Sequence, residues 1–442
     1  MALSFGTDGV RGVAFEQLSE DFCVAFGRAT AEVFGAQICH VGLDSRESGP
    51  TLASALAAGL SAGGVTSVAL GIVPTPAVAH GSRRDACLGV MISASHNVWS
   101  DNGIKIFAPG GLKLDDATQA ELESRLDVHL AAGAVGAPVL VSMPNDDSGV
   151  IDSYLEMVVG ALDGRSLEGF KVVLDCANGA SSSVARSLFE SVGAEVFVMN
   201  AEPNGRNINA DCGSTHPQGL QAEVMARGAD LGLAFDGDAD RLIAVSNDGV
   251  LVDGDRIMGL MAVDFRDRGC LTDDTLVVTV MSNLGLRRAM ESAGVRLLET
   301  GVGDRYVLEA LAEHGLSLGG EQSGHLIFAD IATTGDGLLS GVLLADLVKR
   351  SGVPSSSLAS EVMTNYPQVL INVRVAERPT DIAATLSTEI AEAEAALGDE
   401  GRVLVRASGT EPLVRVMVEA ASADGAQSAA ASLAKVVEAR LG

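Results

Sequence analysis

The chain has 442 residues, of which 47% are hydrophobic and 20% are charged, and its formal net charge at pH 7 is −28. This length exceeds what one hydrophobic core supports and predicts three or four domains. The negative charge argues against general binding to nucleic acid or to an anionic membrane surface, because both are recognised by basic patches. A small anionic substrate is still allowed where Arg, Lys or a metal ion gathers locally.

Three features bear on the compartment. Six cysteines, at positions 23, 39, 87, 176, 212 and 270, show no CxxC or Cys/His spacing, which favours free thiols in a reducing cytosol. The first twelve residues lack a basic segment followed by an apolar run, so we expect no signal peptide. Residues 52–73 are uncharged, but their glycines favour a buried helix and strand over a membrane span. We therefore expect a cytoplasmic protein.

Short apolar runs alternate with longer amphipathic segments along most of the chain. The first group predicts strands at 38–43, 65–70 and 87–92, and helices at 50–62 and 115–131. After Pro144 the pattern restarts, with helices at 151–162 and 180–192 and strands at 171–175, 195–199 and 231–235. After Asp253 it restarts again, with a strand at 276–280 and helices at 255–265, 284–293 and 305–314. The strand–helix–strand order predicts parallel-rich sheets with helices on both faces.

The order changes after Tyr366-Pro367. A strand at 369–375, a helix at 381–397, strands at 403–407 and 414–419 and a helix at 423–441 are expected there. Two strands this close suit antiparallel pairing. We predict an α/β protein with three related α/β domains, at 1–147, 148–252 and 253–364, and a C-terminal α+β domain at 365–442.

The segment Ser93-Ala94-Ser95-His96-Asn97 follows the strand predicted at 87–92. Ligand loops of open α/β sheets lie at such carboxyl ends of strands. Hydroxyls and an imidazole there indicate a nucleophile or a phosphate loop, and a serine-rich capping loop is the structural alternative. A Ser/His hydrolase is disfavoured, because the side chains of neighbours such as Ser95 and His96 rarely face each other and no GxSxG motif is present.

Three carboxylates, of Asp236, Asp238 and Asp240, follow the strand predicted at 231–235. Alternating carboxylates at a turn are typical of a site for a hard divalent ion, although they can also be solvated loop residues. An EF-hand is rejected, because Arg241 and Asn247 stand where that loop needs Gly and Glu. Mg²⁺ is favoured over Ca²⁺ if phosphate is the partner.

Two further segments could bind a ligand. In Gly319-Gly320-Glu321-Gln322-Ser323-Gly324-His325, Glu321 and Ser323 alternate and could face sugar hydroxyls, and His325 could exchange protons near neutral pH. A glycine-rich hairpin is the structural alternative. The segment 406–412, with Arg415 beyond it, predicts an anion nest of backbone N–H groups, hydroxyls and guanidinium groups, against the alternative of an ordinary β-turn.

In this order, and over essentially the whole chain, the motifs resemble the α-D-phosphohexomutase superfamily. Residues 5–12, 300–307 and 320–325, with Gln322, resemble its phosphoglucosamine mutase branch. The resemblance implies three related α/β/α domains with mixed sheets and a fourth α+β domain around a central cleft. One departure is Val98, where the family usually has Pro, and we expect a looser loop with retained activity.

The resemblance also implies roles for individual residues. Ser95 would be the phosphoserine. The Mg²⁺ ligands would be Asp236, Asp238, Asp240 and a phosphoryl oxygen on Ser95. Glu321 and Ser323 would bind sugar hydroxyls, and the non-reacting phosphate would be held by Arg406, Ser408, Gly409, Thr410 and Arg415. The groups near the reacting phosphate, or used in proton transfer, would be Arg11, Lys105 and His325. We expect Lys105 to be a general base with a lowered pKa.

The implied activity is interconversion of glucosamine 6-phosphate and glucosamine 1-phosphate, a phosphosugar substrate pair, through glucosamine 1,6-bisphosphate. It would feed UDP-N-acetylglucosamine and peptidoglycan synthesis. The alternatives are a phosphoglucomutase or phosphomannomutase of the same superfamily, against which Gln322 argues, and a non-catalytic phosphosugar sensor. Such a sensor would lack Ser95 or one of the aspartates. The sequence leaves a homodimer open.

Overall fold

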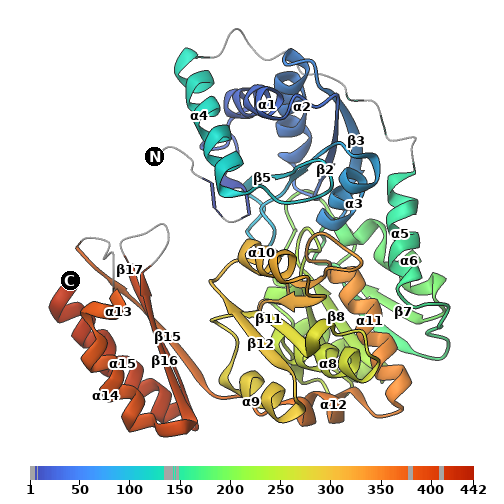
Figure 1. The fold of residues 1–442 in the computed structure, drawn as a ribbon. Coiled ribbons are helices and arrows are strands. Elements are labelled where there is room, and N and C mark those ends of the chain that lie inside the picture. The colour runs from blue at the N-terminus through green and yellow to red at the C-terminus, as the bar shows by residue number, and fades with distance from the viewer. Residues whose placement is uncertain are drawn as a thin grey trace. The chain divides into compact units, whose positions relative to one another are not determined.

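The computed structural model describes residues 5–6, 8–133, 143, 145, 149–376, 382–407 and 413–442. The chain divides into two compact units (Figure 1). The larger unit comprises Met1–Met281 and Val295–Ser360, and the smaller unit comprises Ser282–Gly294 and Glu361–Gly442. The domain boundaries expected near residues 147, 252 and 364 stay predictions.

The larger unit contains three sheets among its described residues. The first has the order β1 (Val10–Val13), β5 (Asp101–Phe107), β4 (Leu88–Ile92), β2 (Ile38–Leu43) and β3 (Thr66–Ile72). The second has the order β10 (Leu251–Val252), β9 (Leu242–Ser246), β8 (Leu231–Phe235), β6 (Lys171–Asp175) and β7 (Glu195–Met199). The third has the order β12 (Arg296–Thr300), β11 (Thr275–Thr279), β13 (Leu318–Gly320) and β14 (Leu326–Phe328).

All three sheets share one pairing scheme. A central strand (β2, β6 or β11) has a parallel neighbour on each side. One of these neighbours (β4, β8 or β13) then turns back through a short loop into an antiparallel strand (β5, β9 or β14). The sheets are therefore mixed, and the three α/β sheets are related, as the fold class predicted. The three loops are residues 93–100, 236–241 and 321–325, so three motifs of the sequence occupy equivalent places.

Helices pack against these sheets. In the larger unit they are α1 (Glu20–Phe34), α2 (Gly49–Ala62), α3 (Thr75–Asp85), α4 (Asp116–Ala132), α5 (Val150–Gly160), α6 (Ala185–Ser191), α7 (Gln218–Arg227), α8 (Gly254–Asp267), α10 (Asp304–His314) and α11 (Gly337–Ser351). A further helix, α12 (Ser355–Val362), spans the division between the units. An apolar cluster joins α1, α2 and α4 to the first sheet through residues such as Phe26, Leu56 and Val90. Burial of such side chains is the main driving force for this packing.

The smaller unit is an α+β structure, as predicted for the C-terminal part. Its antiparallel sheet has the order β15 (Gln368–Arg374), β17 (Leu413–Ala420) and β16 (Gly401–Ala407). Its helices are α9 (Leu284–Ala293), α13 (Ile382–Thr385), α14 (Ser387–Leu397) and α15 (Ala423–Leu441). Helices α14 and α15 lie on one face of the sheet (Figure 1), and Leu386, Val416 and Leu433 belong to the core between them.

Two helices differ from expectation. The helix predicted at 180–192 is a 3-10 turn at Ala180–Ser183 followed by α6, because Val184, with φ −129°, leaves the helical region. The helix predicted at 381–397 is interrupted at Leu386, whose φ is −117°; Asp381 itself lies outside the described residues.

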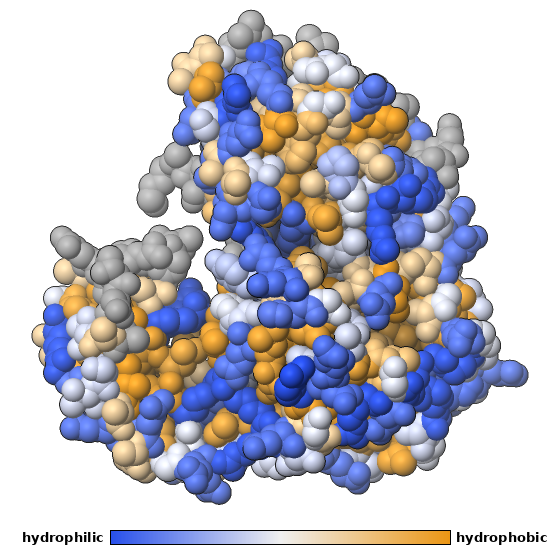
Figure 2. Space-filling view, in the orientation of Figure 1, coloured by the Kyte–Doolittle hydropathy of each residue, from blue (hydrophilic) through white to orange (hydrophobic). Residues whose placement is uncertain are grey.

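Residues 52–73 form the end of α2 and strand β3, as expected. Within the described part of the chain, no helix combines the length and apolarity needed to cross a membrane. Hydrophobic and hydrophilic residues are interspersed over the face seen in Figure 2.

Helices α1 and α2 cross at two glycines. A Cβ added to Gly59 would lie 2.1 Å from the Val24 carbonyl oxygen, and one added to Gly27 would lie 2.3 Å from that of Leu56.

We expect Gly59→Ala to force the helices apart and to lower the free energy of unfolding by about 1–3 kcal/mol. Thermal unfolding followed by circular dichroism measures this. Gly160→Ala in α5 is the matched control, because its Cβ would meet no atom within 4 Å. A midpoint for Gly59→Ala as high as that of the control would contradict the prediction.

Candidate functional site

The serine loop, residues 93–100, holds its central residue in an unusual backbone conformation. Ser95 is 1% exposed and has φ +52°, a left-handed conformation that costs a residue other than glycine about 1–3 kcal/mol. Its N–H donates to Ser93 Oγ at 2.9 Å, and Ser93 Oγ donates to Asp44 Oδ2 at 2.7 Å. The surrounding structure therefore fixes Ser95 in a conformation that the chain would not adopt alone.

The acidic loop, residues 236–241, joins β8 to β9. Asp236, Asp238 and Asp240 are all buried, and one carboxylate oxygen from each lies within 4.8 Å of the others. Among the described residues, the Oδ1 atoms of Asp238 and Asp240 are buried without a hydrogen-bond partner. A buried carboxylate oxygen that accepts no hydrogen bond is costly unless a cation lies close to it. The cluster could therefore hold a metal ion.

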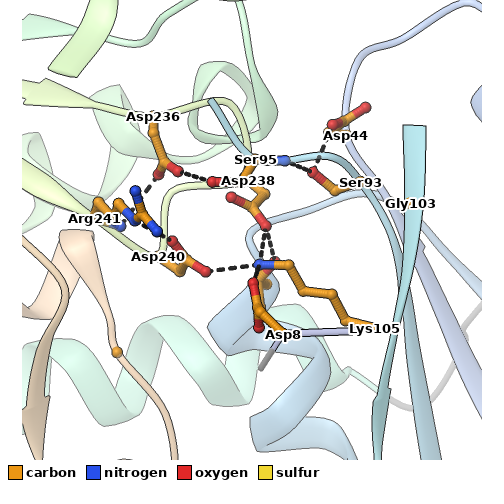
Figure 3. Close-up of polar contacts among 12 residues, drawn as sticks. Asp8, Asp44, Ser93, Ser95, Gly103, Lys105, Asp236, Asp238, Asp240 and Arg241 are labelled. Carbon is orange, nitrogen blue, oxygen red and sulfur yellow. Dashed lines mark hydrogen bonds and ion pairs between the residues drawn. The ribbon is translucent and has the colours of Figure 1, made fainter. Parts of the chain in front are cut away.

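The serine loop and the acidic loop touch directly (Figure 3). Ser95 Oγ donates a hydrogen bond of 2.5 Å to Asp236 Oδ2, which lies 141 positions further along the chain. A Cβ on Gly237 would lie 2.5 Å from the Ser95 carbonyl oxygen, so only glycine allows this approach. Burial, reinforced by the charges of Asp240 and Asp238, raises the pKa of Asp236 well above its usual range.

Lys105, on β5, lies among carboxylates from both loops and from the N-terminal segment. Its Nζ is 2.7 Å from Asp8 Oδ2, 2.7 Å from Asp238 Oδ2 and 2.8 Å from Asp240 Oδ2 (Figure 3). Burial alone would lower the pKa of Lys105, but the three carboxylates outweigh it and raise that pKa well above its ordinary value. The expectation of a lowered pKa for Lys105 is therefore wrong for this arrangement, in which the amine is charged.

His96 does face Ser95, contrary to expectation. Ser95 Oγ and His96 Nδ1 are 3.3 Å apart, and Arg241 Nη1 is 3.3 Å from the same ring nitrogen. A guanidinium group only donates, so Nδ1 is an acceptor. Burial, followed by the charges of Arg241 and Arg11, lowers the pKa of His96 to about 4. Ser95 donates its one hydroxyl hydrogen to Asp236, and an acceptor Nδ1 has no hydrogen to offer, so the imidazole lies beside Ser95 without being its hydrogen-bond partner.

The glycine-rich loop, residues 321–325, joins β13 to β14. It forms a turn, so the strand-like alternation predicted for Glu321 and Ser323 does not apply. Glu321 Oε1 accepts a hydrogen bond of 3.1 Å from Gly303 N, and Ser323 is exposed. His325 is buried, with Nδ1 3.6 Å from Asp240 Oδ1 and Nε2 3.3 Å from Asp304 Oδ2. Burial lowers the pKa of His325, but these two carboxylates outweigh it and raise the pKa.

Two residues of the site, Asp8 and Thr75, were not predicted. Arg11 Nη2 is 3.0 Å from Asp8 Oδ2, and Thr75 Oγ1 donates to Asp238 Oδ2 at 2.7 Å. Asp8 stands in the segment 5–12, of which only Arg11 was given a role. Thr75 stands two residues after the uncharged run 52–73, between Pro74 and Pro76, and was given no role. The sequence signal that could have identified both residues is a polar side chain placed next to a glycine or proline that interrupts apolar sequence.

The predicted anion nest lies in the smaller unit. Arg406 and Arg415 are direct partners in the antiparallel pairing of β16 with β17. Burial and the neighbouring Arg415 lower the pKa of Arg406, and Arg415 Nε is buried without a hydrogen-bond partner among the described residues. Like charges opposite each other destabilise a sheet unless an anion is bound. The other predicted members of the nest, Ser408, Gly409 and Thr410, lie outside the described residues.

Comparison with known proteins places the chain. It matches the phosphoglucomutase/phosphomannomutase α/β/α domains I (residues 2–130), II (152–249) and III (253–366) and the C-terminal domain (370–436) of that family. A phosphoglucosamine mutase of Saccharopolyspora erythraea is 51% identical over 450 residues, covering 99% of this chain and 100% of the relative.

Solved structures agree with this placement. A phosphoglucomutase/phosphomannomutase family protein from Burkholderia thailandensis has a TM-score of 0.80 at 27% identity, covering 99% of this chain and 98% of that one. An Aspergillus fumigatus N-acetylphosphoglucosamine mutase in complex with GlcNAc-6P and magnesium shares the fold, with a TM-score of 0.71 at 20% identity, over 99% of this chain and 96% of that one.

The chain therefore belongs to the phosphoglucomutase/phosphomannomutase family, and within it to the phosphoglucosamine mutases. It is an isomerase of the intramolecular phosphotransferase class. The resemblance noted in the sequence is thereby confirmed.

A buried acid next to the acidic loop gives a prediction about pH. Asp336 precedes α11, whose first N–H, of Gly337, donates to the Ala239 carbonyl oxygen at 3.0 Å. Asp336 Oδ1 lies 2.9 Å from Tyr154 Oη and accepts from Leu339 N at 3.0 Å. Burial raises the pKa of Asp336 to about 6. Because the unfolded value is about 4, the folded state binds this proton more tightly, and the contribution of Asp336 to stability falls as pH rises from about 4 to 6.

We expect Asp336→Asn to keep the helix cap and to remove this loss. The variant should gain stability relative to wild type between pH 4 and pH 7, by up to about 3 kcal/mol. Thermal unfolding of both proteins across that range measures the gain. A difference between them that is independent of pH would contradict the assigned titration.

Proposed function

We propose that the protein interconverts glucosamine 6-phosphate and glucosamine 1-phosphate, with Ser95 as the phosphoryl carrier. One observation carries the assignment of Ser95: its hydroxyl is buried and lies 2.5 Å from Asp236, in a cluster of carboxylates suited to a cation. A serine in a capping loop needs neither burial beside an acidic cluster nor a strained backbone. The relatives named above support the choice of an amino sugar.

Asp236, Asp238 and Asp240 would hold Mg²⁺, together with a phosphoryl oxygen on Ser95. The Oδ1 atoms of Asp238 and Asp240, which accept no hydrogen bond among the described residues, fit a hard cation that takes oxygen ligands. Bound there, Mg²⁺ would neutralise charge on the transferring phosphoryl group. Thr75, by donating to Asp238 Oδ2, would leave Oδ1 of that residue directed at the ion.

The reaction would proceed in two transfers. The bond between phosphorus and Ser95 Oγ breaks as O1 of glucosamine 6-phosphate bonds to phosphorus and gives its proton to a group of the site, which forms glucosamine 1,6-bisphosphate. The bisphosphate then turns over. The bond between O6 and phosphorus breaks as Ser95 Oγ bonds to phosphorus, O6 takes up a proton, and glucosamine 1-phosphate leaves. Arg11, Lys105 and His325 would act near the reacting phosphate, where Lys105 is positioned as a charged donor and His325 as a group for proton transfer.

The rest of the substrate would be held by two groups of residues. Glu321 and Ser323 would bind sugar hydroxyls. The non-reacting phosphate would be bound by Arg406, Ser408, Gly409, Thr410 and Arg415. The facing guanidinium groups of Arg406 and Arg415 support an anion site there. A role in supplying UDP-N-acetylglucosamine for the cell wall, a cytoplasmic location and a homodimer remain predictions.

Replacement of the proposed carrier tests the function directly. We expect Ser95→Ala to carry no phosphate by intact mass and to lose more than about 1000-fold in kcat, because the nucleophilic oxygen is gone. Glucosamine, glucose and mannose 1-phosphates should be assayed side by side, and the wild type should prefer the glucosamine compound. Ser100→Ala, in the same loop, is the control and should keep phosphate and most turnover. Phosphate and full activity in Ser95→Ala would refute the carrier role, and a preference for glucose or mannose 1-phosphate would refute the substrate.

The anion site predicts a separate effect on binding. We expect Arg415→Ala to raise KM for the phosphosugar about tenfold or more, since a charge-assisted contact to phosphate is lost, with a smaller effect on kcat. Steady-state kinetics measure both constants. Arg440→Ala, on helix α15, removes a guanidinium group of the same unit that bonds to the Thr385 carbonyl oxygen, and should leave KM unchanged. An unchanged KM in Arg415→Ala would remove that residue from the site.

A further inference from the structure

The backbone of the serine loop is held by an arginine that lies outside the reacting groups. Arg46 follows strand β2 and is 1% exposed. A guanidinium group has five N–H donors, and five acceptors surround this one. Nε donates to Asp44 Oδ2 at 2.8 Å, and the other four donors reach the carbonyl oxygens of Ser95 (3.0 Å), Asn97 (2.8 Å), Asp101 (2.9 Å) and Val98.

An asparagine from the loop that follows β7 holds two of the same carbonyl groups. Asn209 Nδ2 is 2.9 Å from the Ser95 oxygen and 3.0 Å from the Asn97 oxygen. The backbone N–H of Asn209 donates to the Ala177 carbonyl oxygen at 2.9 Å, which ties this residue to the segment after β6. Asn209 is 8% exposed, and its Nδ2 would lie 2.9 Å from a Cβ on Gly237 of the acidic loop.

We propose that Arg46 and Asn209 are positioning residues that set the place of Ser95 relative to the acidic loop, and this rests on the proposed role of Ser95 as phosphoryl carrier. The carbonyl oxygens of Ser95 and Asn97 each accept two hydrogen bonds. One comes from Arg46, in the first α/β part of the chain, and the other from Asn209, in the second. The loop therefore cannot move with either part alone.

The strain at Ser95 explains why the loop needs such a clamp. A serine at φ +52° relaxes unless its neighbours fix it, and the relaxed loop would carry the hydroxyl away from Asp236. A displacement of about 1 Å at a reacting atom can cost about 100-fold in rate. Loss of the clamp should therefore lower kcat, while the residues that bind the sugar and its other phosphate are unaffected.

Asn209→Ala, in the full-length enzyme, tests the proposal. We expect kcat with glucosamine 1-phosphate, normalised to the phosphorylated fraction from intact mass, to fall about 10- to 100-fold, with KM within about twofold of wild type. Asn207→Ala is the matched control. Its side chain bonds to the Glu202 carbonyl oxygen and to Asn204 N, so it supports the same segment through bonds that do not involve the serine loop. We expect kcat and KM of the control to stay within about twofold of wild type.

Three outcomes overturn the clamp. They are an unchanged kcat in Asn209→Ala, a rise in KM with kcat unchanged, and an equal fall of kcat in both variants, which would mean that only the folding of residues 202–209 matters. The proposed function fails separately, when the wild type itself carries no phosphate on Ser95 or shows no mutase activity.

A second pair of variants tests Arg46. Arg46→Ala leaves Asp44 buried without its cation and can fail to fold, so Arg46→Lys is measured beside it. An ammonium group has three donors at one point and cannot span five acceptors, so we expect kcat of Arg46→Lys to fall at least tenfold. Guanidinium chloride at millimolar concentration should restore part of the kcat of folded Arg46→Ala, while sodium chloride at the same ionic strength should not. Wild-type kcat in Arg46→Lys would overturn the role of Arg46.

Discussion

The ammonium group of Lys105, enclosed by the carboxylates of Asp8, Asp238 and Asp240, is the interaction on which the site depends. Carboxylates removed from water would take up protons or repel one another without a cation among them. Because they come from the N-terminal segment and the second sheet while Lys105 lies on β5, their charge balance also joins two parts of the larger unit. The same charges that suit a metal ion thus hold the residues of the site together.

The nucleophile is held by a different kind of constraint. Ser95 makes no ion pair, and its position follows from backbone hydrogen bonds and from the absence of a side chain at Gly237. Electrostatic attraction and backbone hydrogen bonding therefore position different parts of the site. Buried charges gather the acidic groups, and the hydrogen bonds that Arg46 and Asn209 donate to carbonyl oxygens fix the geometry of the hydroxyl.

The sequence was most informative where a buried strand ends in polar residues. Strands 38–43, 171–175, 195–199 and 231–235 were predicted with their observed bounds, because each is an apolar run closed by a loop signal. Strand β5 was missed since Lys105 interrupts its apolar pattern, and α11 was missed since it is buried on almost all sides and lacks an amphipathic period. The contact of Ser95 with Asp236 joins residues 141 positions apart, so no local pattern contains it. Nor does any local pattern predict the left-handed backbone conformation of Ser95 or the hydrogen bonds from Asn209 to the serine loop.

The repeated sheet scheme has a consequence for how such a site can arise. In all three sheets the turn from a parallel strand into its antiparallel neighbour is set by strand order, whatever residues fill the turn. Copies of one ancestral unit would each carry a loop at this same place in the sheet. Such copies could diverge in loop sequence alone, one acquiring a hydroxyl, another carboxylates and a third a glycine-rich turn, without any change in the framework that carries them.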